Sequence, residues 1–190
     1  MLRTPYARSG GRGQVRIIGG SHRRRILRFP QAEGLRPTTD RVRETLFNWL
    51  GQDLTGLACL DAFAGSGALG FEAASRGARR VVLLEAARAA CEALLANAAQ
   101  LGLTVVEIHC AEALGWMRPS REKFDIIFLD PPFEAGLMPL ALEAAGACLG
   151  PGGRVYVEQA APVAPGPPWG ILRRGDAGRS HFALLEKMPC

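Results

Sequence analysis

The sequence predicts an α/β protein built on a mostly parallel sheet, and three observations carry this prediction. Five short apolar runs, typical of buried strands, alternate with Ala- and Leu-rich stretches typical of helices. A glycine-rich turn follows the first run, where such folds place a ligand. Two further runs near the end are joined by Gly175 to Gly178, which predicts a hairpin and an antiparallel strand at the end of the sheet.

The elements follow in a regular order. We expect strands at 57–62, 81–84, 104–109, 124–129 and 154–158. We expect helices at about 67–76, 86–101, 112–118 and 136–149. Four prolines make 160–169 a loop, and the closing hairpin is expected from 171–174 and 181–187.

A smaller extension precedes this alternation. Residues 1–13 are rich in Gly and Arg without periodicity, and we expect a disordered basic tail. Residues 14–18 and 23–29 flank Gly19-Gly20-Ser21-His22, which predicts a hairpin. A helix is expected next, with Thr39 or Asp40 as N-cap. The chain therefore divides into a tail (1–13), a hairpin and helix extension (14–50) and a main domain (51–190). The apolar stripe of the helix consists of Val42, Leu46, Trp49 and Leu50.

Positive charge is concentrated in the first fifty residues. They hold eleven arginines, no lysine and three acids, a balance of +8, whereas the remainder has a balance of −3. Arginine forks onto phosphates and stacks on bases, so the segment predicts a polyanion-binding arm. The candidate phosphate contacts are Arg23, Arg24, Arg25, Arg36, Arg41 and Arg43.

Composition excludes several classes of protein. No apolar run approaches the roughly 20 residues that span a bilayer, and no apolar stretch of a secretory signal follows the first charges. The five cysteines are scattered and odd in number, so we expect buried small residues or free thiols of a reducing cytoplasm, with no disulfide framework. The three histidines are far apart, so we expect no metal. No apolar stripe is left over, which favours a monomer.

The segment Asp61-Ala62-Phe63-Ala64-Gly65-Ser66-Gly67-Ala68-Leu69-Gly70 predicts a cofactor site. It satisfies the GxGxxG spacing, and Glu85 ends the next strand, as in a dinucleotide site. However, Asp61 ends the strand, where it would repel a pyrophosphate and attract a cation. S-adenosylmethionine carries a cationic amine and a sulfonium, and Glu85 can accept both ribose hydroxyls. The candidate cofactor contacts in this part of the chain are Asp61, Phe63, Ala64, Gly65, Ser66, Gly67, Glu85 and Ala86.

The adenine side of that site is less regular. Cys110 stands where methyltransferases commonly place Asp or Asn to accept from the adenine amine. The backbone N–H of Ala111 is a second candidate contact. Glu112 is either an adenine contact or a helix-start acid favoured by the helix dipole.

Asp130-Pro131-Pro132-Phe133 follows the apolar run 124–129 and predicts methyl transfer to an exocyclic base amine. Such an amine is a poor nucleophile because its lone pair is delocalised into the ring. The Asp130 carboxylate and a backbone carbonyl of the Pro pair can accept its two N–H bonds and localise the lone pair. Phe133 offers a stacking face for a flipped base. Asp130 is also a candidate cofactor contact.

Four segments together resemble the RsmD family of bacterial methyltransferases. They are Val15 to Gly20 (VRIIGG), Gly34 to Leu50 (GLRPTTDRVRETLFNWL), Asp61 to Gly70 (DAFAGSGALG) and Asp130 to Phe133 (DPPF). The resemblance implies a class I S-adenosylmethionine-dependent methyltransferase (Rossmann-like) fold. It also implies methylation of N2 of one guanine in 16S rRNA, within the small ribosomal subunit or its assembly intermediate. S-adenosylhomocysteine would be the product.

Three alternatives remain at this point. An N6-adenine methyltransferase more often carries Tyr or Trp at the end of the tetrapeptide. A non-catalytic ribosome-assembly RNA-binding protein would have no need of Asp61, Glu85 and Asp130. A nucleotide-dependent dehydrogenase is disfavoured by the four residues between the strand and the first glycine.

Overall fold

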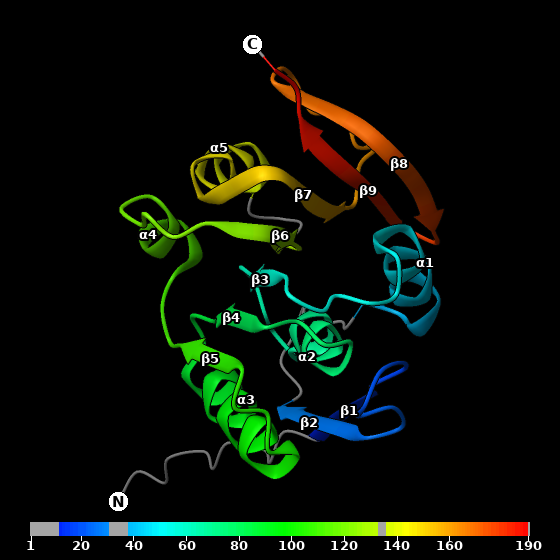
Figure 1. Ribbon diagram of the computed structural model, residues 1–190, viewed down its shortest axis with the longest axis vertical. Helices are drawn as coiled ribbons and strands as arrows, with labels where there is room; N and C mark the ends of the chain where they lie inside the picture. The colour runs from blue at the N-terminus through cyan, green and yellow to red at the C-terminus, as the bar shows by residue number, and fades with distance from the viewer. Residues whose placement is uncertain (1–11, 31–37, 133–135, 190) are drawn as a thin grey trace, which may run out of the picture.

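A seven-stranded mixed sheet runs through the protein in the order β5-β4-β3-β6-β7-β9-β8 (Figure 1). The structure is a computed structural model that describes residues 12–30, 38–132 and 136–189. The strands are β3 (Ala58–Asp61), β4 (Arg80–Leu84), β5 (Val106–His109), β6 (Phe124–Leu129), β7 (Leu149–Gln159), β8 (Trp169–Ala177) and β9 (Ser180–Lys187). The pairs among β5, β4, β3, β6 and β7 are parallel, and β9 pairs antiparallel with both β7 and β8. The predicted α/β class, with its mostly parallel sheet and antiparallel strand, is confirmed.

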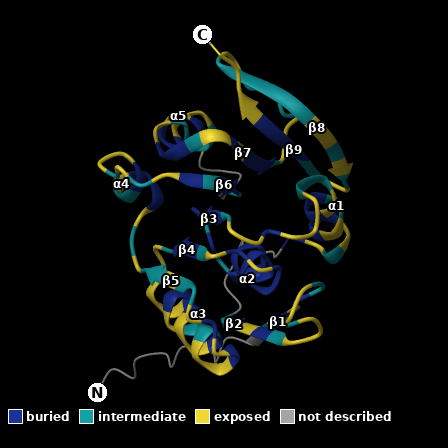
Figure 2. Cartoon of the chain, viewed as in Figure 1, coloured by how far each residue is buried: buried dark blue, intermediate teal, exposed yellow. Residues whose placement is uncertain are grey.

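Helices cover both faces of the sheet. The helices are α1 (Asp40–Leu50), α2 (Ala68–Ser75), α3 (Arg88–Leu101), α4 (Ala113–Met117) and α5 (Met138–Cys148). One core cluster joins α1, α2, α3 and the extension to one face, and a second joins α4 and α5 to the other. All eight residues of α2 are buried, whereas α3 exposes its outer side to solvent (Figure 2).

The extension consists of a hairpin followed by α1. Its strands β1 (Arg12–Arg16) and β2 (Ile26–Pro30) pair antiparallel, as predicted. β1 begins inside the segment that we expected to be a disordered tail, and residues 1–11 lie outside the described part. Asn97 on α3 bonds both backbone groups of Arg28 and so fastens β2 to the main domain. Thr39 is the N-cap of α1, because its side chain accepts from Val42 N.

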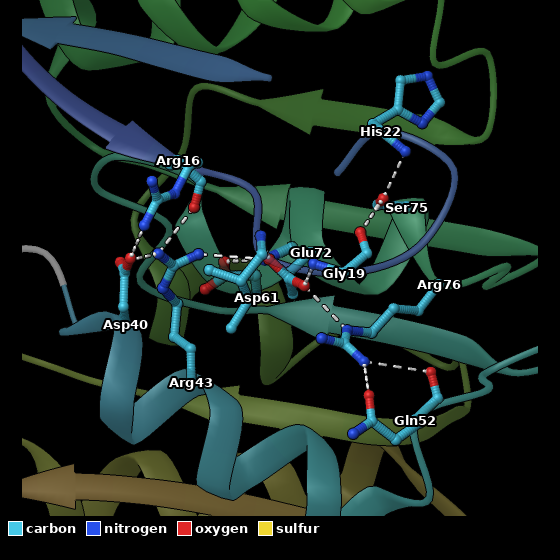
Figure 3. Close-up of polar contacts among 12 residues, drawn as sticks. Arg16, Gly19, His22, Asp40, Arg43, Gln52, Asp61, Glu72, Ser75 and Arg76 are labelled. Carbon is cyan, nitrogen blue, oxygen red and sulfur yellow. Dashed lines mark hydrogen bonds and ion pairs between the residues drawn. The ribbon is translucent and has the colours of Figure 1, made fainter. Parts of the chain in front are cut away.

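Glu72 fastens the extension to the main domain at a second place (Figure 3). It lies on α2 with a fully buried side chain and accepts from the backbone N–H groups of Ile18, at 2.9 Å, and Gly19, at 2.7 Å. It also pairs with Arg76 at 2.9 Å and with Arg43 at 3.3 Å. A buried carboxylate is stable only when charged and hydrogen-bonding groups satisfy it, so this cluster fixes the hairpin relative to α2.

Arg43 is a correction to the sequence-based prediction of a phosphate contact. Its side chain is fully buried, and it donates to Asp40, to the Arg16 carbonyl and to Glu72. A guanidinium with these partners is not available to a phosphate. The apolar stripe of α1 did not reveal the burial of Arg43, because its buried partner Glu72 lies 29 residues away in the sequence.

The cysteines are a second correction. We expected no disulfide, but Cys91 near the start of α3 and Cys110 after β5 form one, with their Cα atoms 5.8 Å apart. That separation is typical of a disulfide. The pair escapes sequence inspection because its 19-residue spacing matches no motif. Cys59 and Cys148 are free and buried, as expected, and Cys190 lies outside the described residues.

We predict that Glu72→Gln lowers the free energy of unfolding by about 3 kcal/mol or more, since it leaves Arg76 buried without its counter-charge and leaves Arg43 with Asp40 alone. Urea unfolding measures the loss. The control is Glu92→Gln on α3, which removes an exposed pair with Arg88 and is expected to change little. Equal losses in the two variants would contradict a special role for the buried cluster.

Candidate active site

The connectivity of the sheet marks one place at its edge as a ligand site. From β3 the chain adds β4 and β5 on one side, and then returns to add β6 and β7 on the other. Parallel sheets bind ligands outside the carboxyl ends of the strands where the order reverses in this way. The reversal lies between β3 and β6, which end at Asp61 and Leu129.

Four carboxyl groups lie along this edge of the sheet. Asp61 ends β3, Glu85 follows β4, Asp130 follows β6 and Glu158 lies one residue before the end of β7. Because side chains alternate along a strand and Asp61 is in register with Phe128, all four belong to the same face of the sheet. It is the face that α1 and α2 cover.

Asp61 joins the end of β3 to the first turn of α2. It is buried, and its Oδ2 accepts from Gly70 N at 2.9 Å. Burial raises the pKa of Asp61 to about 7, the charge of Glu85 adds to the rise, and backbone N–H groups of Gly70 and Phe63 oppose it. A cation beside this carboxyl would therefore be strongly favoured.

The glycine turn and Glu85 form one unit. Gly65 N donates to Glu85 Oε2 at 2.8 Å, and Ala87 N donates to Oε1 at 2.7 Å. Each oxygen retains a lone pair for a further donor such as a ribose hydroxyl. Gly67 has φ of 77°, and a Cβ there would lie 2.6 Å from side-chain atoms of Leu94 and Phe71, so only glycine fits.

The remaining residues of the predicted cofactor site lie along this turn and just after β4. Ala64 is tied to β4, because its N–H donates to the Leu84 carbonyl at 2.9 Å. Ala64 and Ser66 are buried, Phe63 is half-buried and Ala86 is exposed. The turn therefore holds a fixed shape between β3 and α2.

On the predicted adenine side, Glu112 takes the helix-start role, and an adenine contact by its side chain stays a prediction. Glu112 is the N-cap of α4 and accepts from Leu114 N at 3.0 Å and Gly115 N at 2.6 Å, so it is a helix-start acid. Cys110 is exposed but held in the disulfide. The N–H of Ala111 donates to the His109 carbonyl at 3.0 Å and is engaged within the chain.

Asp130 stands at the end of β6 with a buried Pro131 and an exposed Pro132 after it. Its Oδ2 accepts from Thr38 Oγ at 3.4 Å. Burial raises the pKa of Asp130 well above its ordinary value, and the charges of Glu158 and Asp61 add to the rise. Phe133, the predicted stacking residue, lies outside the described residues.

Three side chains beside Asp130 were missed by the sequence analysis. Thr38 also donates to Glu158 Oε2 at 3.3 Å, and Tyr156 Oη donates to the same oxygen at 2.9 Å. The available signal was the charge of Glu158 directly after the buried apolar run Val155 to Val157, the same pattern that singled out Asp61 and Asp130. Thr38 carried no such signal, because its neighbours come from β6 and β7.

The predicted phosphate contacts fall into three groups. Arg23, Arg24 and Arg25 are exposed in the turn between β1 and β2, where Arg24 has a φ of 72°. Arg41 is exposed on the first turn of α1. Arg36 lies outside the described residues, and Arg43 is buried as described above.

The described residues also bear on metal binding and on insertion into a membrane. No three His, Cys, Asp or Glu side chains gather there in a way that could hold a metal ion. Within the same residues, no helix combines the length and apolar character needed to cross a membrane.

The chemistry of the side chains at this edge decides whether the site fits S-adenosylmethionine. The largest influences that raise the pKa values of Asp61 and Asp130 are burial and neighbouring carboxylates. Such a cluster is stabilised by a cation and would repel a pyrophosphate. The residues therefore fit a cationic donor and not a dinucleotide.

Comparison with known proteins gives a consistent result. The family model described as Conserved hypothetical protein 95 matches residues 15–186. Ribosomal RNA small subunit methyltransferase D of Escherichia coli K12 is 40% identical over 183 residues, 93% of this chain and 92% of the relative. The protein of the same name from Haemophilus influenzae is 37% identical over 97% of this chain and 98% of the relative.

A solved structure extends the agreement to the fold. The structure described as "Putative methyltransferase yhhF from Escherichia coli" superimposes with a TM-score of 0.82 at 38% identity, over 93% of this chain and 99% of that one. The fold is thus the Rossmann-like methyltransferase fold with an N-terminal hairpin. With the family model spanning nearly the whole chain, the protein belongs to the RsmD family.

Proposed function

We propose that the protein methylates N2 of one guanine in 16S rRNA of the small ribosomal subunit, with S-adenosylmethionine as donor. The observation that carries the proposal is the position of Asp130, a partly exposed acid at the switch point of the sheet, near the carboxylate of Asp61. The relatives named for small-subunit ribosomal RNA support the choice of substrate. We further propose that the enzyme acts in the cytoplasm as a monomer.

The donor would be held by the glycine turn and the two acids that flank it. When bound, S-adenosylmethionine supplies an electrophilic methyl group on a positively charged sulfur. Asp61 offers a negative charge to the cationic methionyl part, and Glu85 offers its remaining lone pairs to the ribose. Phe63, Ala64, Ser66, Ala86, Cys110 and Ala111 would line the remaining surface, and the backbone at Gly65 and Gly67 allows close approach.

The base amine would be held by Asp130 and the carbonyl of Pro131. Together they accept the two N–H bonds, which turns the nitrogen lone pair toward the methyl group. The new N–C bond would use this lone pair while the bond between the methyl carbon and the sulfur breaks, with S-adenosylhomocysteine as the leaving group. The nitrogen would then release one proton, which Asp130 would accept. Positioning and the charge of Asp130 would supply most of the catalysis. Pro132 and Phe133 would complete the face on which the base lies.

The exposed arginines would position the RNA. Arg23, Arg24 and Arg25 lie on the hairpin turn and Arg41 on α1, and both elements are fixed to the domain that carries Asp130. Arg36 is proposed as a further contact. Phosphate contacts of this kind set register and orientation, whereas the pocket selects the base.

The proposal is tested by methyl transfer from labelled S-adenosylmethionine to deproteinised 16S rRNA and to small subunits that lack the modification. The labelled nucleoside is identified by mass spectrometry. N2-methylguanosine at one position is expected. Label on adenine would overturn the choice of base, and absence of label on both substrates would overturn the choice of RNA.

We predict that Asp130→Ala lowers the rate of methyl transfer at least about 100-fold, since it removes the carboxylate that accepts a hydrogen bond from the base amine. Donor affinity, measured by calorimetry, is expected to stay within a few-fold. The matched control is Glu143→Ala on α5, an exposed acid away from this edge, which is expected to keep full activity. Equal loss of transfer and donor affinity would make Asp130 chiefly a cofactor ligand.

We predict that Asp61→Asn weakens donor binding at least about tenfold and stabilises the free protein above pH 7. The raised pKa of Asp61 means that its contribution to stability is present below about pH 4 and is lost as pH rises through about 7. Asparagine removes that loss and still accepts from Gly70 N. Urea unfolding at pH 5 and pH 8 measures the difference in stability between the variant and the wild type. A variant that is less stable than the wild type at pH 8 would contradict the prediction.

We predict that replacing Arg23, Arg24 and Arg25 together by Gln weakens RNA binding and flattens its salt dependence, by up to about 0.7–0.9 in slope for each lost phosphate contact. Titration of 16S rRNA at several salt concentrations measures both. A triple variant of the exposed residues Arg88, Arg118 and Arg121 changes the charge equally and serves as the control. Equal effects of the two triple variants would indicate general electrostatics.

A further inference from the structure

Behind Asp130 lies a second carboxylate for which the proposed reaction gives no role. Glu158 is 5% exposed and lies on β7, next to β6. The pairing of Leu129 with Val157 places Asp130 and Glu158 side by side on the same face of the sheet. A buried acid is costly unless it is paired or hydrogen-bonded, so its retention beside Asp130 calls for a chemical reason.

The hydroxyl of Thr38 connects the two acids. Its Oγ lies 3.4 Å from Asp130 Oδ2 and 3.3 Å from Glu158 Oε2. A hydroxyl has a single hydrogen to donate, so it can serve only one carboxylate fully at a time. Tyr156 Oη, 2.9 Å away, supplies Glu158 with a donor of its own. The arrangement leaves the Thr38 hydrogen available to Asp130.

We propose that Glu158 is a positioning residue for Asp130: through Thr38 it fixes the orientation of the Asp130 carboxylate, and through its charge it strengthens that carboxylate as acceptor of the amine proton. This inference rests on the role of Asp130 in the proposed function. No covalent step involves Glu158. It acts only on the acid that touches the substrate.

The charges around Asp130 give the direction of this effect. Among the described residues, Asp61 faces it from β3, Glu158 and Tyr156 from β7, and Thr38 from the segment before α1. After burial, the charge of Glu158 is the largest influence that raises the pKa of Asp130, whereas the Thr38 hydrogen bond lowers it. An acceptor of higher pKa takes a proton more readily, but it is ionised only at higher pH.

Two variants should therefore move the pH profile in opposite directions. Glu158→Gln keeps the shape and removes the charge, so the rise of activity with pH should shift to lower pH by about one unit or more, with a lower plateau. Thr38→Val keeps the shape and removes the hydroxyl, so the rise should shift to higher pH. Thr38→Ser restores the hydroxyl and should keep the wild-type profile.

The experiment is single-turnover methyl transfer to the small subunit between pH 5 and 9, with saturating S-adenosylmethionine. Donor affinity and melting temperature are measured for each variant, so that a misfolded protein is recognised. If Glu158→Gln does not fold, the test rests on Thr38→Val, whose rise should shift to higher pH, and on Thr38→Ser, which should keep the wild-type profile. A uniform loss at every pH, without a shift in either position, would overturn the inference.

Failure of the proposed function is distinguished by including Asp130→Ala in the same series. If that variant transfers methyl groups at the wild-type rate, the role of Asp130 is wrong and this inference falls with it. If that variant is inactive and neither Glu158→Gln nor Thr38→Val shifts the profile, only the role of Glu158 is wrong. If Asp130→Ala is inactive and the profiles of Glu158→Gln and Thr38→Val shift in opposite directions, the roles of Asp130 and Glu158 are both supported.

Discussion

Four carboxyl groups at one edge of a parallel sheet are the constraint on which the rest of this structure depends. Asp61, Glu85, Asp130 and Glu158 come from four adjacent strands, and strand alternation places them on one face. Like charges at such a place destabilise the folded chain unless hydrogen-bond donors, protons or a cation compensate them. The backbone donors of the glycine turn compensate in part. A cationic ligand would complete the compensation, so the cluster favours binding at the expense of stability.

The N-terminal extension belongs to the same arrangement. Glu72 and Asn97 fasten the hairpin to α2 and α3, and Thr38, just before α1, reaches the acids on β6 and β7. The exposed arginines of the hairpin therefore belong to a segment that hydrogen bonds fix to the domain carrying the four carboxyl groups. A methyltransferase that must place one base of a large RNA gains precision from such a junction, because phosphate contacts alone set only register and orientation.

The sequence predicted the fold well because periodicity reports local burial. The strand before Asp130 was placed with its observed bounds, and the acids after β3, β4 and β6 were recognised by their position at the ends of apolar runs. The features that the sequence could not predict are contacts between residues that lie far apart in the sequence. Arg43 is buried in an ion pair with Glu72. Cys91 on α3 forms a disulfide with Cys110 after β5. Thr38 donates a hydrogen bond to Glu158, which lies 120 residues away in the sequence. In each case the single residue carries no periodic signal of its partner.

The most direct test of this account is the number of protons released when the donor binds near pH 7, obtained by calorimetry in buffers of different ionisation enthalpy. Because the pKa of Asp61 is about 7 and that of Asp130 is raised, a bound cation should expel a fraction of a proton. S-adenosylmethionine should release more than S-adenosylhomocysteine, which lacks the charge on sulfur. Tight binding of both ligands with equal release, or with none between pH 6 and 8, would contradict a site built on the charge of its carboxylates.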